Sequence, residues 1–256
     1  LGAELEIIEP CGFLLSDKRF KRVVMDYMDN KEIKFYQSFD RFYKDKKNHR
    51  IVLMTTKASI SYTKFKFKKS DTILIHGGSS GIGTAAIQLC KVHGCKVITT
   101  VGNKKKQLYC KKLGADLAID YNKNNFLEEI TKYTKSKGVD IILDMVGQKY
   151  FEKNVLLLKD KGKLIMIAFL SGSITKADFT AIMTKRLILT GSTLRPRTEQ
   201  EKAKIAKNLH KSYWTAFTKK TIKPNIYKIF NLKDASKAHK LMESSKHLGK
   251  IVLKTK

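Results

Sequence analysis

Acidic residues, cysteines and long apolar runs are scarce in this sequence of 256 residues. The four cysteines, Cys11, Cys90, Cys95 and Cys110, form no CxxC pair and follow no zinc-finger spacing, so we expect no bound metal. No run of about 18 apolar residues is present, which predicts that no helix spans a membrane. Residues 1–15 lack the basic region and cleavage site of a secretory signal. We therefore expect a globular, cytoplasmic protein.

Basic residues outnumber acidic residues by 52 to 23, which gives a net charge of +29 at pH 7. Such a charge attracts phosphate, nucleic acid and anionic membranes. The lysines are spread along the whole chain, however, and this favours solvated faces over one nucleic-acid site. Residues 31–47 interleave lysine with phenylalanine and tyrosine, a pattern that keeps binding of single-stranded nucleic acid as an alternative.

Short apolar runs alternate with helical patterns from Thr72 onward. This alternation predicts βαβ units, and right-handed crossovers then give a doubly wound parallel sheet of the Rossmann type. The predicted strands are 72–76, 96–101, 117–121, 139–143, 163–169 and 187–190. The predicted helices are 84–93, a lysine-rich helix ending at Gly114, 126–134 and 150–158. After Arg197 the pattern changes to helices at 199–218 and 234–244 and strands at 224–230 and 250–254.

The segment His76–Gly83, with the sequence HGGSSGIG, follows the first of these strands and opens a helix. Glycines let the backbone approach a pyrophosphate closely, and the N–H groups at the start of a helix hold that anion. A glycine turn can also serve packing alone. Because the βαβ pattern continues after this turn, we favour a dinucleotide site.

The end of the second predicted strand discriminates between NAD and NADP. An NAD site carries Asp or Glu there to bind the ribose 2′-hydroxyl. This chain instead has TTVGNKKK at residues 99–106, with three lysines and no acid. The sequence therefore predicts NADPH as the cofactor, and the missing acid is the stronger argument because lysine is common everywhere in the chain.

Ordered motifs from about Asp71 to the C-terminus resemble the medium-chain dehydrogenase/reductase superfamily, in its zinc-free, zeta-crystallin-like quinone oxidoreductase branch. They include residues 72–88, 113–116, 119–121, 138–140, 144–147, 167–169, 190–195 and 249–253. The resemblance implies that Gly78, Ser80, Gly81 and Ile82 lie under the pyrophosphate. It also implies contacts of Lys106 with the 2′-phosphate, Tyr121 with the adenosine, Val146, Ile167 and Phe169 with the nicotinamide side, and His247 with the cofactor. For His247, an exposed loop histidine is the alternative.

The N-terminal part resembles the family only in pieces. Leu1–Glu4 and Lys18–Met25 are similar to parts of the family's β-rich, GroES-like catalytic domain, but the segment with its substrate-pocket asparagine and tyrosine is absent. We expect a partial β-rich catalytic domain over 1–65, an NADPH-binding Rossmann domain over 66–195, and a return to the catalytic domain over 196–256. The first residue is Leu1, and we expect the sequence to be a fragment of a longer protein.

The function that the resemblance implies is NADPH-dependent hydride transfer to a quinone or another conjugated carbonyl compound, by a homodimer. A quinone takes its protons from solvent, so we nominate no catalytic residue. Two alternatives stay open. One is a non-catalytic NADPH-binding protein with an RNA-binding basic surface, and the other is an enoyl-thioester reductase of the same superfamily.

Overall fold

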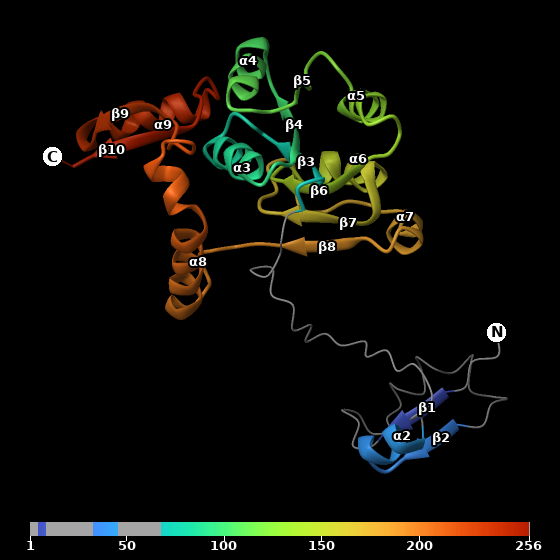
Figure 1. The fold of residues 1–256 in the computed structure, drawn as a ribbon. Helices are drawn as coiled ribbons and strands as arrows, with labels where there is room; N and C mark the ends of the chain where they lie inside the picture. Colours follow the sequence, from blue (N-terminus) through green and yellow to red (C-terminus); the bar gives the residue numbers. More distant parts are fainter. Residues whose placement is uncertain (1–4, 9–32, 46–67, 256) are drawn as a thin grey trace. The chain divides into compact units, whose positions relative to one another are not determined.

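The computed structural model describes residues 5–8, 33–45 and 68–255 of the chain (Figure 1). The chain divides into two compact units, unit 1 (Leu1–Ser61) and unit 2 (Tyr62–Lys256). Most of the predicted β-rich domain, with Cys11, lies outside the described residues. The described part of unit 1 consists of strands β1 (Leu5–Ile8) and β2 (Ile33–Tyr36), which pair in parallel, and helix α2 (Phe39–Asp45).

Unit 2 is built on a parallel sheet of six strands in the order β5-β4-β3-β6-β7-β8. This is the order of a doubly wound nucleotide-binding fold, so the predicted fold class is confirmed. Its strands are β3 (Thr72–His76), β4 (Lys96–Val101), β5 (Leu117–Asp120), β6 (Val139–Asp144), β7 (Leu158–Met166) and β8 (Ile188–Gly191).

Helices cover both faces of this sheet (Figure 1). Because strand side chains alternate, Ile73 and Ile75 of β3 pack with Ile87 on one face, whereas Leu74 packs with Ile130 on the other. The first face carries α3 (Gly81–Val92) and α4 (Lys104–Lys112). The second carries α5 (Phe126–Tyr133), the short η2 (Gln148–Tyr150) and α6 (Phe151–Leu157), and α7 (Thr180–Thr184) precedes β8. Two apolar cores therefore hold the sheet rigid from both sides.

Three boundaries differ from the sequence prediction by three residues or more. Helix α3 begins at Gly81 rather than Thr84, because the Ser80 side chain caps it by accepting from the Gly83 N–H at 3.0 Å. Strand β7 begins at Leu158 rather than Lys163, passing through Lys161 in a left-handed conformation, with φ of 59°. The same strand ends at Met166, so residues 167–169 lie in the loop that follows it.

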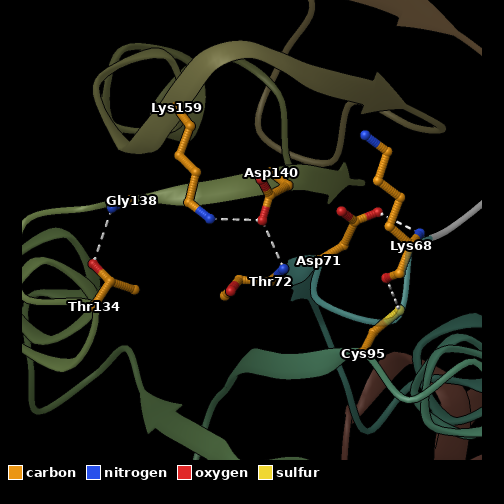
Figure 2. Close-up of polar contacts among 8 residues, drawn as sticks. All are labelled: Lys68, Asp71, Thr72, Cys95, Thr134, Gly138, Asp140 and Lys159. Atoms are coloured by element: carbon orange, nitrogen blue, oxygen red, sulfur yellow. Dashed lines mark hydrogen bonds and ion pairs between the residues drawn. The ribbon is translucent and has the colours of Figure 1, made fainter.

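Polar contacts tie the amino ends of the strands together (Figure 2). Asp140 Oδ2 accepts from the Thr72 N–H at 2.8 Å and from Lys159 Nζ at 2.7 Å, which links β3, β6 and β7. Further contacts at this edge are Lys68 N to Asp71 Oδ2 at 2.9 Å, Cys95 Sγ to Lys68 O at 3.6 Å and Gly138 N to Thr134 Oγ1 at 3.1 Å. These contacts lie at the amino edge of the sheet, opposite the carboxyl edge that is described below.

The C-terminal part of unit 2 contains α8 (Glu199–Thr218), β9 (Ile226–Asn231), η3 (Leu232–Asp234), α9 (Ala235–Glu243) and β10 (Lys250–Lys254). Strands β9 and β10 form a separate parallel pair. Gln88 of α3 bonds both backbone groups of Lys223, at 2.9 and 3.1 Å, and His93 bonds the Tyr213 hydroxyl at 2.6 Å. No helix among the described residues is long and apolar enough to cross a membrane.

Candidate functional site

The predicted site residues gather at the carboxyl edge of the six-stranded sheet. Parallel strands all end at the same edge, and the strand order reverses between β3 and β6, where a crevice for a ligand is expected. The edge collects Gly78, Ser80, Gly81 and Ile82 after β3, Tyr121 after β5, Val146 after β6, and Ile167 and Phe169 after β7. Residues that lie far apart in the sequence thus border one site.

The glycine turn is held so closely that side chains do not fit into it. Gly77 has a left-handed φ of 67°. A Cβ on Gly78 would overlap the Thr99 side chain of β4, and a Cβ on Gly83 would overlap the Gly77 carbonyl oxygen. The Gly78 N–H donates to Thr100 O at 3.1 Å, which fixes the turn against β4. The resulting backbone cradle fits a phosphate group that approaches the start of α3.

The first turn of α3 provides the positive end of a helix. It contains no acidic residue, and Ser80 caps it. The N–H groups of Gly81 and Ile82 have no acceptor within the helix because they belong to its first turn. Ile82 is 51% exposed, so this end of the helix is open to solvent. The arrangement is suited to an anion.

At the end of β4 the chain carries no carboxylate, and Asn103 Oδ1 caps α4 by accepting from the Lys106 N–H at 2.9 Å. Lys106 Nζ donates to the Ser245 carbonyl at 2.6 Å. Partial burial lowers the pKa of Lys106. Tyr121 is 46% exposed and its hydroxyl lies beside Gly102, so it borders the same end of β4. The structure thus brings the lysine and the tyrosine to one side of the site.

His247 lies next to Lys106. Burial lowers the pKa of His247, and the positive charge of Lys106 lowers it further. Its Nδ1 atom is shielded from solvent and has no hydrogen-bond partner among the described residues. The structure therefore places His247 at the Lys106 end of the site, with Nδ1 buried and the ring bonded to the Leu241 backbone.

A second group of residues borders the ends of β6 and β7. The Asp144 carboxylate accepts from the N–H groups of Val146 at 2.7 Å and Gly147 at 3.2 Å, which fixes the turn after β6. Ile167 N donates to Asp144 O at 2.8 Å, and Phe169 is 51% exposed. Ile167 and Phe169 were expected at a strand end, and they instead lie in the loop after β7, because β7 ends at Met166, three residues earlier than predicted.

A buried polar network below the glycine turn was missed by sequence reasoning. His76 Nδ1 contacts Thr100 Oγ1 at 2.9 Å, and His76 Nε2 contacts Asn154 Oδ1 at 2.8 Å. The His76 ring also lies 4.7 Å from the Tyr150 ring and 5.1 Å from that of Phe126. Burial lowers the pKa of His76, against the opposing effects of Asn154 and Asp144. His76 is therefore a neutral residue that joins β3, β4 and α6 beneath the site.

Sequence carried no local sign of this network, since His76 and Asn154 are 78 residues apart. Burial raises the pKa of Tyr150 to about 12, so its hydroxyl is protonated at neutral pH. Among the described residues no group of three or more His, Cys, Asp or Glu side chains is placed to hold a metal ion.

Replacing His76 with glutamine should reduce the pH dependence of the unfolding free energy. Glutamine can bond Thr100 and Asn154 but does not titrate. Neutral His76 contributes stability above its ordinary pKa of 6.5, and this is lost as pH falls through its lowered folded-state pKa, at about 1.4 kcal/mol per pH unit. Urea unfolding between about pH 7.5 and 5.5 measures the difference. The exposed control His239→Gln should keep the wild-type slope, and equal slopes in all three proteins would contradict the prediction.

The strand order and the glycine turn define a dinucleotide-binding α/β domain of the dehydrogenase type. A family model described as zinc-binding dehydrogenase matches residues 81–210. Human quinone oxidoreductase is 28% identical over 187 residues, which cover 73% of this chain and 55% of that protein. The structure of Escherichia coli quinone oxidoreductase complexed with NADPH is similar with a TM-score of 0.65 and 27% identity, covering 74% of this chain and 58% of that one. The chain belongs to the zinc-binding dehydrogenase family, within the medium-chain dehydrogenase/reductase superfamily and its zinc-free quinone oxidoreductase-like branch.

A shorter similarity is to a different kind of protein. A tRNA (cytidine(34)-2′-O)-methyltransferase of Beijerinckia indica is 41% identical over 87 residues, which cover 33% of this chain and 54% of that protein. The chain thus spans a little over half the length of each of these relatives.

Proposed function

We propose that the chain binds NADPH and transfers a hydride to a quinone or another conjugated carbonyl compound. The observation that carries the proposal is the glycine cradle at the start of α3, next to a β4 end that lacks a carboxylate and has Lys106 instead. A related solved structure contains NADPH, which supports this choice of cofactor. An enoyl thioester is the alternative acceptor.

The residues of the carboxyl edge fit NADPH in position and charge. The turn Gly78–Ile82 would hold the pyrophosphate, because its N–H groups and helix end attract an anion. Lys106 and His247 would bind the 2′-phosphate, and Tyr121 would lie beside the adenosine. The segments at Val146 and 167–169 would border the nicotinamide. NADPH supplies the hydride, and the chain contributes position and electrostatics. No catalytic residue is proposed, since a quinone takes its protons from solvent.

We further propose that residues 66–195 act as the cofactor domain and that 196–256 belong to the substrate domain. For residues 1–65 we keep the prediction of a partial β-rich catalytic domain, and an alternative that involves binding of tRNA is described below. Buried free thiols at Cys90, Cys95 and Cys110 support a reducing, cytoplasmic location. The position of β8 at the edge of the sheet supports a homodimer.

Lys106→Glu should weaken binding of NADPH by about tenfold or more, because a charge-assisted contact to the 2′-phosphate is lost and a repulsion gained. Binding of NADH, which has no 2′-phosphate, should change little. Fluorescence titration of both nucleotides measures this. Lys105→Glu makes the same change of charge on an exposed residue of α4 and should keep the wild-type preference for NADPH. Equal affinities of the wild-type chain for the two nucleotides would contradict the proposed cofactor.

Quinone reduction by these 256 residues should be slow although NADPH binds. Orientation of two reactants can lower a barrier by about 7–11 kcal/mol, and an incomplete substrate wall loses part of this. A chain extended at its N-terminus to the full family pattern should be about tenfold or more faster, since each 1.4 kcal/mol changes a rate about tenfold. Single-turnover NADPH oxidation with 1,4-benzoquinone measures both chains. Similar NADPH affinities with unequal rates support the proposal; equal rates would show that residues 1–70 already complete a pocket.

A second candidate function is binding of tRNA. The 41% identity to a tRNA methyltransferase is the specific observation that favours it. The match spans 87 residues, more than the 61 of unit 1, so it extends into unit 2. The parallel pairing of β1 with β2 accords with an α/β unit better than with a β-rich one. The net charge of +29 would strengthen binding to any RNA.

Binding to tRNA should be tighter than binding to an unstructured RNA of equal length. If charge alone acts, both RNAs should bind equally and lose affinity in parallel as salt is raised, because phosphate contacts release counterions. Filter binding over a series of salt concentrations measures both. Saturating NADPH should leave tRNA affinity unchanged if the RNA site is in unit 1. Equal affinities for the two RNAs would contradict this second function and leave the first untouched.

A further inference from the structure

The buried side chain of Gln88 joins the second half of α3 to the segment that follows α8. Gln88 is only 8% exposed. Its Nε2 donates to Thr84 O at 3.0 Å and to Lys223 O at 3.1 Å, and its Oε1 accepts from the Lys223 N–H at 2.9 Å. One amide thus holds both backbone groups of Lys223 and fixes that residue on α3.

From Lys223 the contacts continue to the start of the last strand. Asn225 Nδ2 donates to Lys223 O at 3.3 Å, and Asn225 O accepts from the Lys250 N–H at 2.7 Å. Gly249 has a left-handed φ of 81°, and a Cβ on it would overlap the Asn225 carbonyl oxygen. The Gly249 N–H donates to Ser79 O at 2.8 Å. These contacts form a ring that leaves α3 in its second half and returns to the glycine turn before it.

The ring fixes Gly249, and residues 245–248 just before it border the proposed 2′-phosphate site. The Ser245 carbonyl accepts from Lys106 Nζ at 2.6 Å, and the charge of Lys106 acts on the neighbouring His247. One end of this segment is attached to α9, and the other end is held at Gly249. A shift of Gly249 would therefore move the groups that face Lys106.

The glycine turn has supports of its own. Ser80 caps α3, and the Gly78 N–H donates to Thr100 O at 3.1 Å. Ile87, next to Gln88 in the same helix, is completely buried in the core. Loss of the Gln88 contacts should therefore leave the pyrophosphate cradle in place and release the segments that contain Lys223 and Gly249.

We propose that Gln88 is a positioning residue for recognition of the 2′-phosphate, although it lies in the second half of α3, away from the carboxyl edge of the sheet. By holding Lys223 on α3, Gln88 sets the position of Gly249. The segment before Gly249 then presents its groups to Lys106. This inference rests on the proposed function and adds to it a residue that favours NADPH over NADH without binding either nucleotide.

The competing explanation is that Gln88 only stabilises unit 2. Two variants separate these explanations. Gln88→Met keeps the length of the side chain and removes its hydrogen bonds. Gln88→Glu turns a carboxylate towards Thr84 O and Lys223 O, which repel it. Burial raises the pKa of a carboxyl group, and a protonated carboxyl can donate to one of these oxygens again as pH falls. Gln200→Glu makes the same change of charge at an exposed residue of α8 and serves as the control.

Dissociation constants for NADPH and NADH test the proposal by fluorescence titration from about pH 8 to 5.5, with circular dichroism to verify folding. Each variant is compared with the wild type at the same pH, because a phosphate monoester itself titrates at about pH 6. Gln88→Met should weaken NADPH about fivefold at every pH and leave NADH nearly unchanged. Gln88→Glu should weaken NADPH about tenfold or more at pH 8, and the loss should shrink as pH falls. Gln200→Glu should bind both nucleotides like the wild type.

The outcomes are distinct. Wild-type affinities in Gln88→Met, or equal weakening of NADPH and NADH, overturn this inference and leave the proposed function standing. If Gln88→Met does not fold, Gln88→Glu decides, and a loss of NADPH affinity that is independent of pH overturns the inference. A wild-type chain that binds neither nucleotide overturns the proposed function and this inference together.

Discussion

The close approach of the glycine turn to β4 is the constraint on which unit 2 depends. Gly78 touches the Thr99 side chain, and Gly83 lies against the Gly77 carbonyl, so neither position has room for a side chain. This contact sets where α3 begins and directs its first N–H groups to the carboxyl edge of the sheet. A longer or bulkier turn would lift α3 off β3 and β4 and open the core around Ile87, whose side chain is completely buried.

Charge is distributed around this edge in a consistent way. The start of α3, Lys106 and Lys250 are all positive, and neither the end of β4 nor the first turn of α3 carries a carboxylate. The acid that does lie nearby, Asp144, is buried and bonded to the N–H groups of Val146 and Gly147. The Asp144 carboxylate is thus paired with backbone N–H groups of a turn, and it does not neutralise the positive groups at the edge of the sheet.

The two units pose different physical problems. Unit 2 has two apolar cores, one on each face of its sheet, and its site lies on rigid strand ends. The chain matches only 55–58% of the length of its quinone oxidoreductase relatives. The substrate wall is therefore considered separately from the cofactor cradle. The described part of unit 1 combines two parallel strands with a helix.

The sequence alone determined the order of strands and helices and the glycine turn, and it led to the prediction of a 2′-phosphate rather than a free 2′-hydroxyl. Each of these depends on neighbours within a few residues: apolar periodicity, turn chemistry, and the absence of an acid after residues 96–101. The predicted start of β7 was wrong, because the strand continues through Lys161, a residue in the left-handed conformation. Only the tertiary structure decided which side chains meet. Lys106 and Ser245 are 139 residues apart, His76 and Asn154 are 78 apart, and Lys250 reaches Gly81 from the other end of unit 2. Such contacts follow from the packing of α6 on the sheet and of residues 245–250 against α4 and the glycine turn, and no local pattern encodes that packing.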